Sequence, residues 1–153
     1  RRALPQEAER CWDIRNQAVR YGCKTSYDPG IIKAWTPDKM PEQYRQEIVS
    51  HSFFVAVGDD DLAVATGYLD LSAGSVEAIF TLPEYTGKGL AALIVDEIKK
   101  EARIHGFASI TLSSTPNAQH FYEKQGFAFV RESVHFSASA QAHLRCIDMI
   151  FML

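Results

Sequence analysis

The sequence predicts a single α/β domain over residues 1–153, with a mixed, mostly antiparallel central sheet of six to seven strands flanked by about four helices. Three observations predict this class. The chain has 153 residues, 46% of them hydrophobic, which is the size of one core rather than two. Short strand-like runs separated by turn sequences favour antiparallel neighbours. Residues 76–113 then read as strand, glycine-rich turn, helix and strand, an order that favours a parallel pair.

Three helices are expected before the first strand. Over residues 5–21, hydrophobic residues recur at every third or fourth position, and a proline stands where the first helical turn begins. A turn at residues 27–30 leads into a short helix over residues 31–35, and a third helix is expected over residues 41–50. Because the chain starts at Arg1 rather than methionine, the completeness of an N-terminal strand stays open.

Three strands are expected next. Residues 52–57, 62–71 and 76–82 are rich in the β-branched, aromatic and small hydrophobic residues that strands favour. Turn sequences separate them, GDDD at residues 58–61 and SAGS at residues 72–75. We therefore expect an antiparallel meander.

The second half of the chain is expected to alternate helices with strands. A hydrophobic stripe with helical spacing predicts a helix of about four turns, which Gly106 ends. A strand over residues 108–113, a short helix over 117–125 and closing strands over 127–130 and 146–151 should follow. The alanine- and serine-rich stretch between the two closing strands is expected to be a loop.

Composition excludes several classes of function. A net charge of −3 and a pI near 5.9 argue against a nucleic-acid binder, which would gather a basic excess on one face. No hydrophobic run is long enough to span a membrane and no leader is recognisable, so we expect no membrane partner and a cytoplasmic location. The cysteines Cys11, Cys23 and Cys146 form no C-x-x-C pair, and the five histidines show no metal-ligand spacing, so no metal is expected.

A glycine-rich turn between strand and helix is the clearest functional signal. Gly87 and Gly89 are expected in the first helical turn, where each destabilises the helix by about 1 kcal/mol relative to alanine. Glycines at these positions therefore indicate a role outside the helix, such as the close approach of a ligand to the backbone. Free amides at a helix start, together with the positive end of the helix dipole, bind phosphate. The P-loop and dinucleotide-binding glycine patterns do not fit, which leaves a different phosphate-bearing cofactor as the hypothesis.

Two motifs, taken together, resemble the GNAT superfamily of acyl-CoA-dependent N-acetyltransferases. They are LPEYTGKGLA at residues 82–91 and TPNAQHFYEKQGF at residues 115–127, and the resemblance is strongest over residues 53–130. It implies transfer of an acetyl group from acetyl-CoA to a primary amine of a small molecule or peptide, by direct attack in a ternary complex. It also implies that the strands before and after the long helix splay apart.

The resemblance also implies which residues contact coenzyme A. The pyrophosphate loop would consist of Thr86, Gly87, Lys88, Gly89, Leu90 and Ala91. The pantetheine arm would pair with the strand edge at Phe80, Thr81 and Leu82, and Asn117 would contact this arm or cap the short helix. Thr86 departs from the long polar or cationic side chain usual at its position; it either weakens cofactor binding, caps the helix or donates its hydroxyl.

Glu77 is the candidate general base. Strand alternation places it on one face with Ile79 and Thr81. The opposite face would carry Val76, Ala78, Phe80 and Leu82. Hydrophobic neighbours raise the proton affinity of a carboxylate, and relatives use a glutamate near this point to deprotonate the acceptor. The alternative is that Glu77 faces solvent.

Tyr122 is the candidate general acid. Helical geometry turns it away from its neighbour Phe121, which is the better candidate for the core. The resemblance implies that Tyr122 donates a proton to the departing thiolate of coenzyme A. A second buried aromatic residue is the alternative.

The acceptor itself is not identified by the sequence. Tyr27, Trp35, Tyr68 and Asp70 could line an acceptor pocket, although aromatic residues at such positions are more often core. A homodimer is left open. The competing function is a non-catalytic acyl-CoA-binding regulatory or interaction module with the same fold, which the departure at Thr86 keeps open.

Overall fold

One six-stranded sheet organises the chain. The computed structural model describes all residues from 1 to 153, and its five α-helices, three short 3-10 helices and six strands follow in chain order. The α-helices are α1 (Ala8–Gly22), α2 (Pro29–Trp35), α3 (Glu42–Ser50), α4 (Leu90–Ile104) and α5 (Gln119–Lys124). The strands are β1 (Ser52–Val57), β2 (Ala63–Asp70), β3 (Ser75–Thr81), β4 (Ser109–Ser114), β5 (Ala128–Ser137) and β6 (Ala142–Met152). The fold class expected from the sequence is confirmed, with five rather than about four helices.

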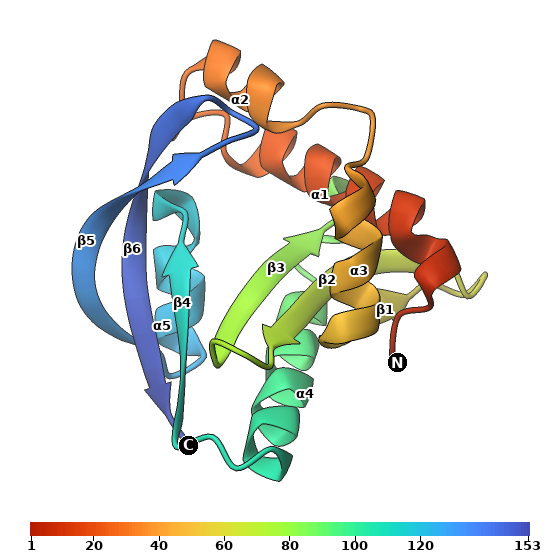
Figure 1. Cartoon of the computed structure of the whole chain (residues 1–153), viewed down its shortest axis with the longest axis vertical. Coiled ribbons are helices and arrows are strands. Elements are labelled where there is room, and N and C mark those ends of the chain that lie inside the picture. Colours follow the sequence, from red (N-terminus) through yellow and green to blue (C-terminus); the bar gives the residue numbers. More distant parts are fainter.

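The sheet is mixed and mostly antiparallel. Its strand order is β1-β2-β3-β4-β6-β5, and every neighbouring pair is antiparallel except β3 and β4. The meander from β1 to β3 and the parallel crossover through α4 are therefore as predicted. Helix α4, which connects the two parallel strands, lies behind β2 and β3 (Figure 1).

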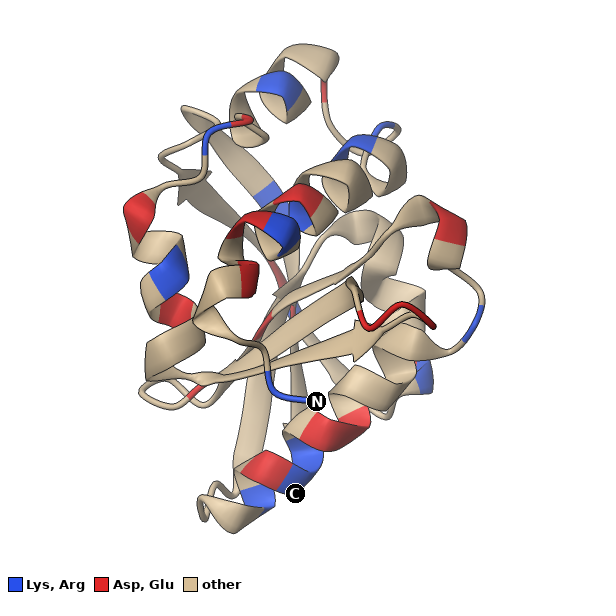
Figure 2. Ribbon diagram, turned by 90° about the vertical axis from the view of Figure 1, so that its right-hand side faces the viewer, with Lys and Arg blue, Asp and Glu red and all other residues tan.

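Helices cover both faces of the sheet. Helices α4 and α5 pack on one face, where fully buried Val95 and Ile98 meet Leu69 and Ile110. Helices α1 and α3 cover the β1–β3 part of the other face through Trp12, Tyr44 and Phe53, among others. In the side view, positively and negatively charged residues are interspersed along the helices rather than gathered by sign (Figure 2). None of the helices combines the length and hydrophobicity that crossing a bilayer requires.

The sheet opens between β3 and β4. These strands share a single paired position, Ser75 with Thr111, next to one hydrogen bond from the Thr111 N–H to the Gly74 carbonyl at 3.1 Å. Beyond this point they diverge toward their carboxyl ends (Figure 1). The splay implied by the family resemblance is thus present, and it leaves the facing edges of both strands without strand partners.

The prediction of a loop throughout the stretch between the two closing strands is wrong. Strands β5 and β6 form a long hairpin whose connection is only residues 138–141. Nearly every residue of β5 is exposed, because it is the edge strand. A strand held by backbone pairing at an edge needs no buried hydrophobic alternation, so its sequence resembles a loop.

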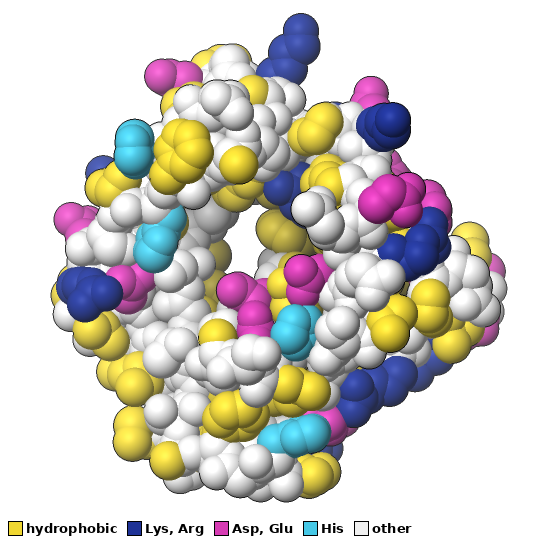
Figure 3. All heavy atoms as spheres, in the orientation of Figure 1, with side chains coloured by type: hydrophobic (Ala, Val, Ile, Leu, Met, Phe, Trp, Pro, Cys, Tyr) yellow, Lys and Arg dark blue, Asp and Glu magenta, His cyan; other side chains and the backbone are white.

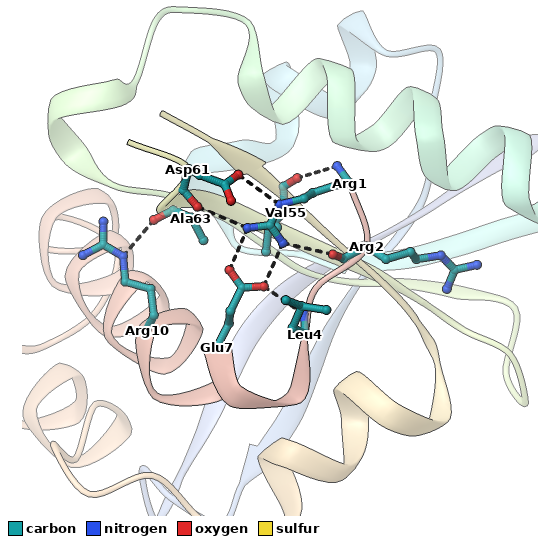
Figure 4. A network of polar contacts seen from close by, with 8 residues as sticks. All are labelled: Arg1, Arg2, Leu4, Glu7, Arg10, Val55, Asp61 and Ala63. Carbon is teal, nitrogen blue, oxygen red and sulfur yellow. Dashed lines mark hydrogen bonds and ion pairs between the residues drawn. The ribbon is translucent and has the colours of Figure 1, made fainter. Parts of the chain in front are cut away.

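The N-terminal residues lie along β1. Arg2 forms an antiparallel bridge with Phe54, and the Ala3 N–H donates to the Phe53 carbonyl at 3.0 Å. The Arg1 guanidinium, which reaches Glu7 at 2.9 Å, holds this segment against helix α1 (Figure 4).

Candidate functional site

The glycine-rich turn leads into α4 through left-handed backbone. Gly87 and Gly89 have φ angles of 77° and 78°, and α4 begins at Leu90, so neither glycine lies in the first helical turn as expected. A Cβ atom at either position would meet nothing within 4 Å. Glycine is therefore required here by the positive φ and not by crowding.

The backbone of this turn offers free hydrogen-bond donors. The amides of residues 87–92 have no acceptor within the protein, since the first bond of α4 runs from the Leu93 N–H to the Gly89 carbonyl. A pocket of about 450 Å³ lies beside them, bounded by Tyr85 on one side and by Phe121 of α5 and Gln125, just after α5, on the other. Six free amides at a helix start form a site suited to phosphate oxygens.

Thr86 neither caps the helix nor reaches into it. Its hydroxyl donates to the Pro83 carbonyl at 2.9 Å, and the N-cap of α4 is Gly89 without a side-chain hydrogen bond. The prediction that Thr86 could cap the helix is wrong, because its hydroxyl is hydrogen-bonded within the turn that precedes the helix. Lys88 is exposed, with its Nζ 5.1 Å from the centre of the Tyr85 ring.

A bulge in β3 changes which residues share a face. Ala78 has a φ of 56°, and the pairing of β2 with β3 shifts between Thr66 and Tyr68. The Thr66 hydroxyl donates to the Ala78 carbonyl at 2.7 Å and fixes the irregular backbone. The extra residue reverses the alternation beyond it, because each further residue then points to the opposite face.

The expected alternation of residues 76–82 is therefore wrong. Val76 and Ile79 pack together in the core beneath α4, although they were assigned to opposite faces. Phe80 and Leu82 pack on the α1 side instead of sharing the face of Val76. No pattern of hydrophobic residues reports a bulge, since every residue involved is compatible with a strand.

Glu77 lies directly opposite Tyr68 on the neighbouring strand and is half-buried. Burial raises the pKa of its carboxyl, and the negative charge of Asp70 raises it further, while a hydrogen bond from Ser75 opposes the shift. The solvent-facing alternative does not describe this side chain. A partly desolvated carboxylate of this kind is suited to accept a proton.

Glu77 forms one wall of a cleft of about 370 Å³ at the start of the splay. The opposite wall is supplied by the other half of the sheet, through Ser113, His135 and Asp148 among others. The space-filling view shows a hollow through the middle of this face, with acidic and histidine side chains on its rim (Figure 3).

Sequence reasoning missed this opposite wall. Arg131, Ser133 and His135 fall in the stretch expected to be a loop, and Asp148 lies in the strand that pairs with them. The signal that could have found them is the polar residue at every second position from 131 to 135, because such spacing places all three on one face of a strand.

The locations expected for Phe121 in the core and Tyr122 outside it are reversed in the structure. The ring of Tyr122 is only 8% exposed and belongs to the core, whereas Phe121 is half-buried and lines the pocket beside the glycine-rich turn. Burial raises the pKa of the Tyr122 hydroxyl, and the charge of Glu77 adds to the shift. A hydroxyl in this position stays protonated at neutral pH and can act as a proton donor.

Asn117 caps neither neighbouring helix. Its side-chain carbonyl accepts a weak hydrogen bond from the Cys23 thiol, with Sγ and Oδ1 3.6 Å apart, and the adjoining helices have no side-chain cap. The capping role considered from the sequence is wrong. Asn117 instead connects the end of α1 with the turn after β4.

The four expected acceptor residues lie in two groups. Tyr27 and Trp35 form an edge-to-face pair with ring centres 5.6 Å apart, and the Tyr27 hydroxyl donates to the Arg145 carbonyl at 2.6 Å. Tyr68 stacks on Phe53 at 5.1 Å, in a different hydrophobic cluster. Phe80 packs against both clusters.

Asp70, the fourth of these residues, uses its carboxylate to stabilise the turn that follows β2. Its carboxylate accepts hydrogen bonds from the amides of Ser72 and Ala73 at 2.8 and 2.9 Å. Its Oδ1 also lies 3.8 Å from His51 Nδ1. Asp70 therefore acts on the cleft through its charge, which raises the pKa of Glu77.

His51 and Glu47 lie behind Glu77, outside the lining of the cleft, and were not expected from the sequence as residues that influence the site. The Leu71 N–H donates to His51 Nδ1 at 3.1 Å, so Nδ1 is an acceptor and the proton of the neutral ring is on Nε2. That nitrogen lies 3.2 Å from a Glu47 carboxylate oxygen. The charge of Glu47 also raises the pKa of Glu77.

Known proteins match most of the chain. The family described as "Acetyltransferase (GNAT) domain" matches residues 16–150. An uncharacterized acetyltransferase of Streptococcus pyogenes serotype M1 is 30% identical over 92 residues, which are 58% of this chain and 64% of the relative. The chain thus spans less than two thirds of that relative. The uncharacterized N-acetyltransferase YafP of Escherichia coli K12 is 27% identical over 129 residues, 84% of this chain and 79% of YafP.

Solved structures share the fold at low sequence identity. A GCN5-related N-acetyltransferase from Rhodopseudomonas palustris superposes with a TM-score of 0.91 at 18% identity, covering 100% of this chain and 94% of the other. The PaiA N-acetyltransferase of Thermoplasma acidophilum, solved in complex with coenzyme A, gives a TM-score of 0.75 at 19% identity, with coverages of 100% and 97%.

Proposed function

Because the chain belongs to the GNAT acetyltransferase family, we propose that it transfers the acetyl group of acetyl-CoA to a primary amine of a small molecule or peptide. The splay between β3 and β4 carries this proposal. It lies between a phosphate-suited turn at the start of α4 and a cleft containing Glu77, so that the two substrates can approach from opposite sides.

The residues around α4 fit coenzyme A. The free amides of residues 87–92 would hold the pyrophosphate, together with the positive end of the helix dipole. The edge of β3 at residues 80–82 lies where β4 has diverged, and would pair its backbone with the amides of the pantetheine arm. A backbone N–H at this edge would polarise the acetyl carbonyl. Bound coenzyme A in the PaiA structure supports this assignment.

The charge of the cleft fits an amine. Glu47, Asp70 and Glu77 lie close enough for the first two to raise the pKa of the third. Such a group of carboxylates attracts an ammonium ion and disfavours an anionic acceptor. Tyr68, beside Glu77, would provide an aromatic surface for the acceptor.

Glu77 would act as the proton acceptor and Tyr122 as the proton donor. Glu77 would accept a proton from the acceptor nitrogen, whose lone pair forms the new C–N bond. The C–S bond then breaks with its electron pair on sulfur, and the buried Tyr122 hydroxyl would protonate that thiolate. The pKa values of both residues are raised, which suits these roles. Glu77 must bind a proton, and Tyr122 must keep its proton until the thiolate departs.

Titration with acetyl-CoA, followed by an assay of thiol release over a panel of amines, tests the proposal. We expect saturable binding and thiol release that depends on an amine such as spermidine, butylamine, lysine or glucosamine. Binding without release by any amine would favour the non-catalytic module. If acetyl-CoA does not bind at all, both functions are wrong.

A further inference from the structure

A polar network built around Asp148 forms the wall of the cleft opposite Glu77. The Ser113 and Ser133 hydroxyls lie 2.9 and 3.0 Å from Asp148 Oδ1, and Arg131 Nε lies 3.0 Å from Oδ2. His135 joins this network through Nε2, which is 3.0 Å from the Ser133 hydroxyl and 3.5 Å from Asp148 Oδ1. None of these groups has a part in the mechanism described so far.

The directions of these hydrogen bonds decide where the proton of His135 lies. Burial alone would raise the pKa of Asp148, but the hydrogen bonds from Ser113, Ser133 and His135 and the charge of Arg131 hold it below its usual range. The carboxylate is therefore ionised and only accepts hydrogen bonds.

Both serine hydroxyls must consequently donate to Asp148. The Ser133 oxygen is then left to accept a hydrogen bond from His135 Nε2, which carries the proton of the neutral ring. The second ring nitrogen, Nδ1, has no hydrogen-bond partner in the protein and keeps a free lone pair. An imidazole held in this tautomer at the wall of a cleft is arranged as a proton acceptor.

The reaction removes two protons from the nitrogen of the acceptor. An ammonium group loses two protons on becoming an amide, one before the C–N bond forms and one afterwards. The departing thiolate takes one proton from Tyr122. If two groups in the cleft remove the protons from nitrogen, one proton can return to Tyr122 and the other can leave to water, which balances the reaction.

We propose that His135 is the second proton acceptor, alongside Glu77, and that Ser133 and Asp148 are the positioning residues that keep its Nδ1 free. This inference rests on the proposed function. His135 and Glu77 line the same cleft from opposite halves of the sheet, so an amine between them can give one proton to each.

The charged and polar groups around His135 suit this role. It faces Glu77 of β3, Ser113 of β4 and Asp148 of β6, with Arg131 and Ser133 on its own strand. His135 is also exposed, so that it can pass its proton to water.

Replacement of His135 in the full chain provides the main test. With the amine that wild type acetylates fastest, His135→Gln should lower kcat about 10- to 100-fold because one proton acceptor is lost, and leave the KM for acetyl-CoA within about twofold. The decline of wild-type activity at acidic pH should also change in this variant. Added imidazole should raise the rate of His135→Ala but not that of His105→Ala, a matched control at the far end of α4.

The positioning residues have a separate test. Ser133→Ala should lower kcat less than His135→Gln and move the acidic limb of the pH profile, and Ser133→Thr should restore both because it retains the hydroxyl. Unchanged kcat and pH profile in His135→Gln, or a His135→Ala defect that imidazole does not relieve, would overturn the inference while leaving the proposed function intact. If none of the amines in the panel causes wild type to release thiol, the proposed function fails and this inference fails with it.

Discussion

The turn at residues 86–91 and the cleft at Glu77 lie on either side of the splay, and one consists of backbone groups whereas the other consists of side chains. The turn presents backbone amides in one continuous segment, and its side chains contribute little beyond the absence of a Cβ at two positions. The cleft presents side chains from β3, β4, β5 and β6. A site made of backbone depends on local conformation, whereas a site made of side chains depends on how distant strands are placed.

The two regions also differ in electrostatic sign. Free amides, the start of α4 and the exposed Lys88 give the turn a positive potential. Glu77 carries a carboxylate in the wall of the cleft, and Glu47 and Asp70 lie close enough behind it to raise its pKa, so this side of the cleft is negative. An anionic cofactor and the cationic acceptor that we propose would therefore be attracted to different regions and would meet at the splay.

The largest expected effect concerns the proton donor between the two regions. Tyr122→Phe should lower kcat about 100-fold because the thiolate leaves without its proton, while the Kd for acetyl-CoA stays within about twofold. The ring remains in the core, so folding should not suffer. Stopped-flow turnover and calorimetric titration measure the two quantities. Tyr21→Phe on the exposed side of α1 is the control, and an unchanged kcat would remove Tyr122 from the mechanism.

Glu77→Gln should come next, with a loss of about 30- to 100-fold in kcat. A base works only when deprotonated, so wild-type activity should fall as the pH drops through the raised pKa of Glu77. The glutamine cannot titrate, so the part of this decline that Glu77 contributes should be lost from the pH profile. Glu97→Gln on the outer face of α4 should behave like wild type. A profile identical to that of wild type in Glu77→Gln would assign the base elsewhere.

Gly89→Ala tests the backbone site and should weaken acetyl-CoA binding without lowering kcat at saturation. Alanine with a φ of 78° costs about 1–2 kcal/mol, or about 5- to 30-fold in Kd if the free turn relaxes and binding must restore it. Gly106→Ala is a matched control, since its φ is 79° but it follows α4. Equal Kd values for the two variants would show that the turn does not hold the cofactor.

The smallest expected effect comes from Thr86→Arg. A guanidinium beside the pyrophosphate should tighten binding about two- to fivefold, which is the modest contribution of an exposed ion pair. The gain should diminish with added salt. Ser72→Arg adds the same charge in a remote turn and should have no effect. Weaker binding by Thr86→Arg would mean that the phosphates lie elsewhere.

The secondary structure was largely predictable where local signals and burial coincide. Helix α4 and the strands of the meander carry clear periodicity because one face of each element packs on the core. Strand β5 was missed beyond Val130 because an exposed edge strand has no hydrophobic face to repeat. The same omission concealed the wall of the cleft that contains His135.

The sequence by itself determined the fold class, the glycine-rich turn and the identity of Glu77 and Tyr122 as candidates. The fold class and the turn follow from composition, periodicity and residues adjacent in the chain, which are local properties, and the two candidate roles follow from the resemblance of the motifs to the GNAT superfamily. Only the tertiary structure decided that the bulge at Ala78 reverses the later part of β3, that the Tyr122 ring is core, and that His135 and Asp148 stand opposite Glu77. Bulges and strand order arise from pairing between segments far apart in the chain, and no local pattern specifies them.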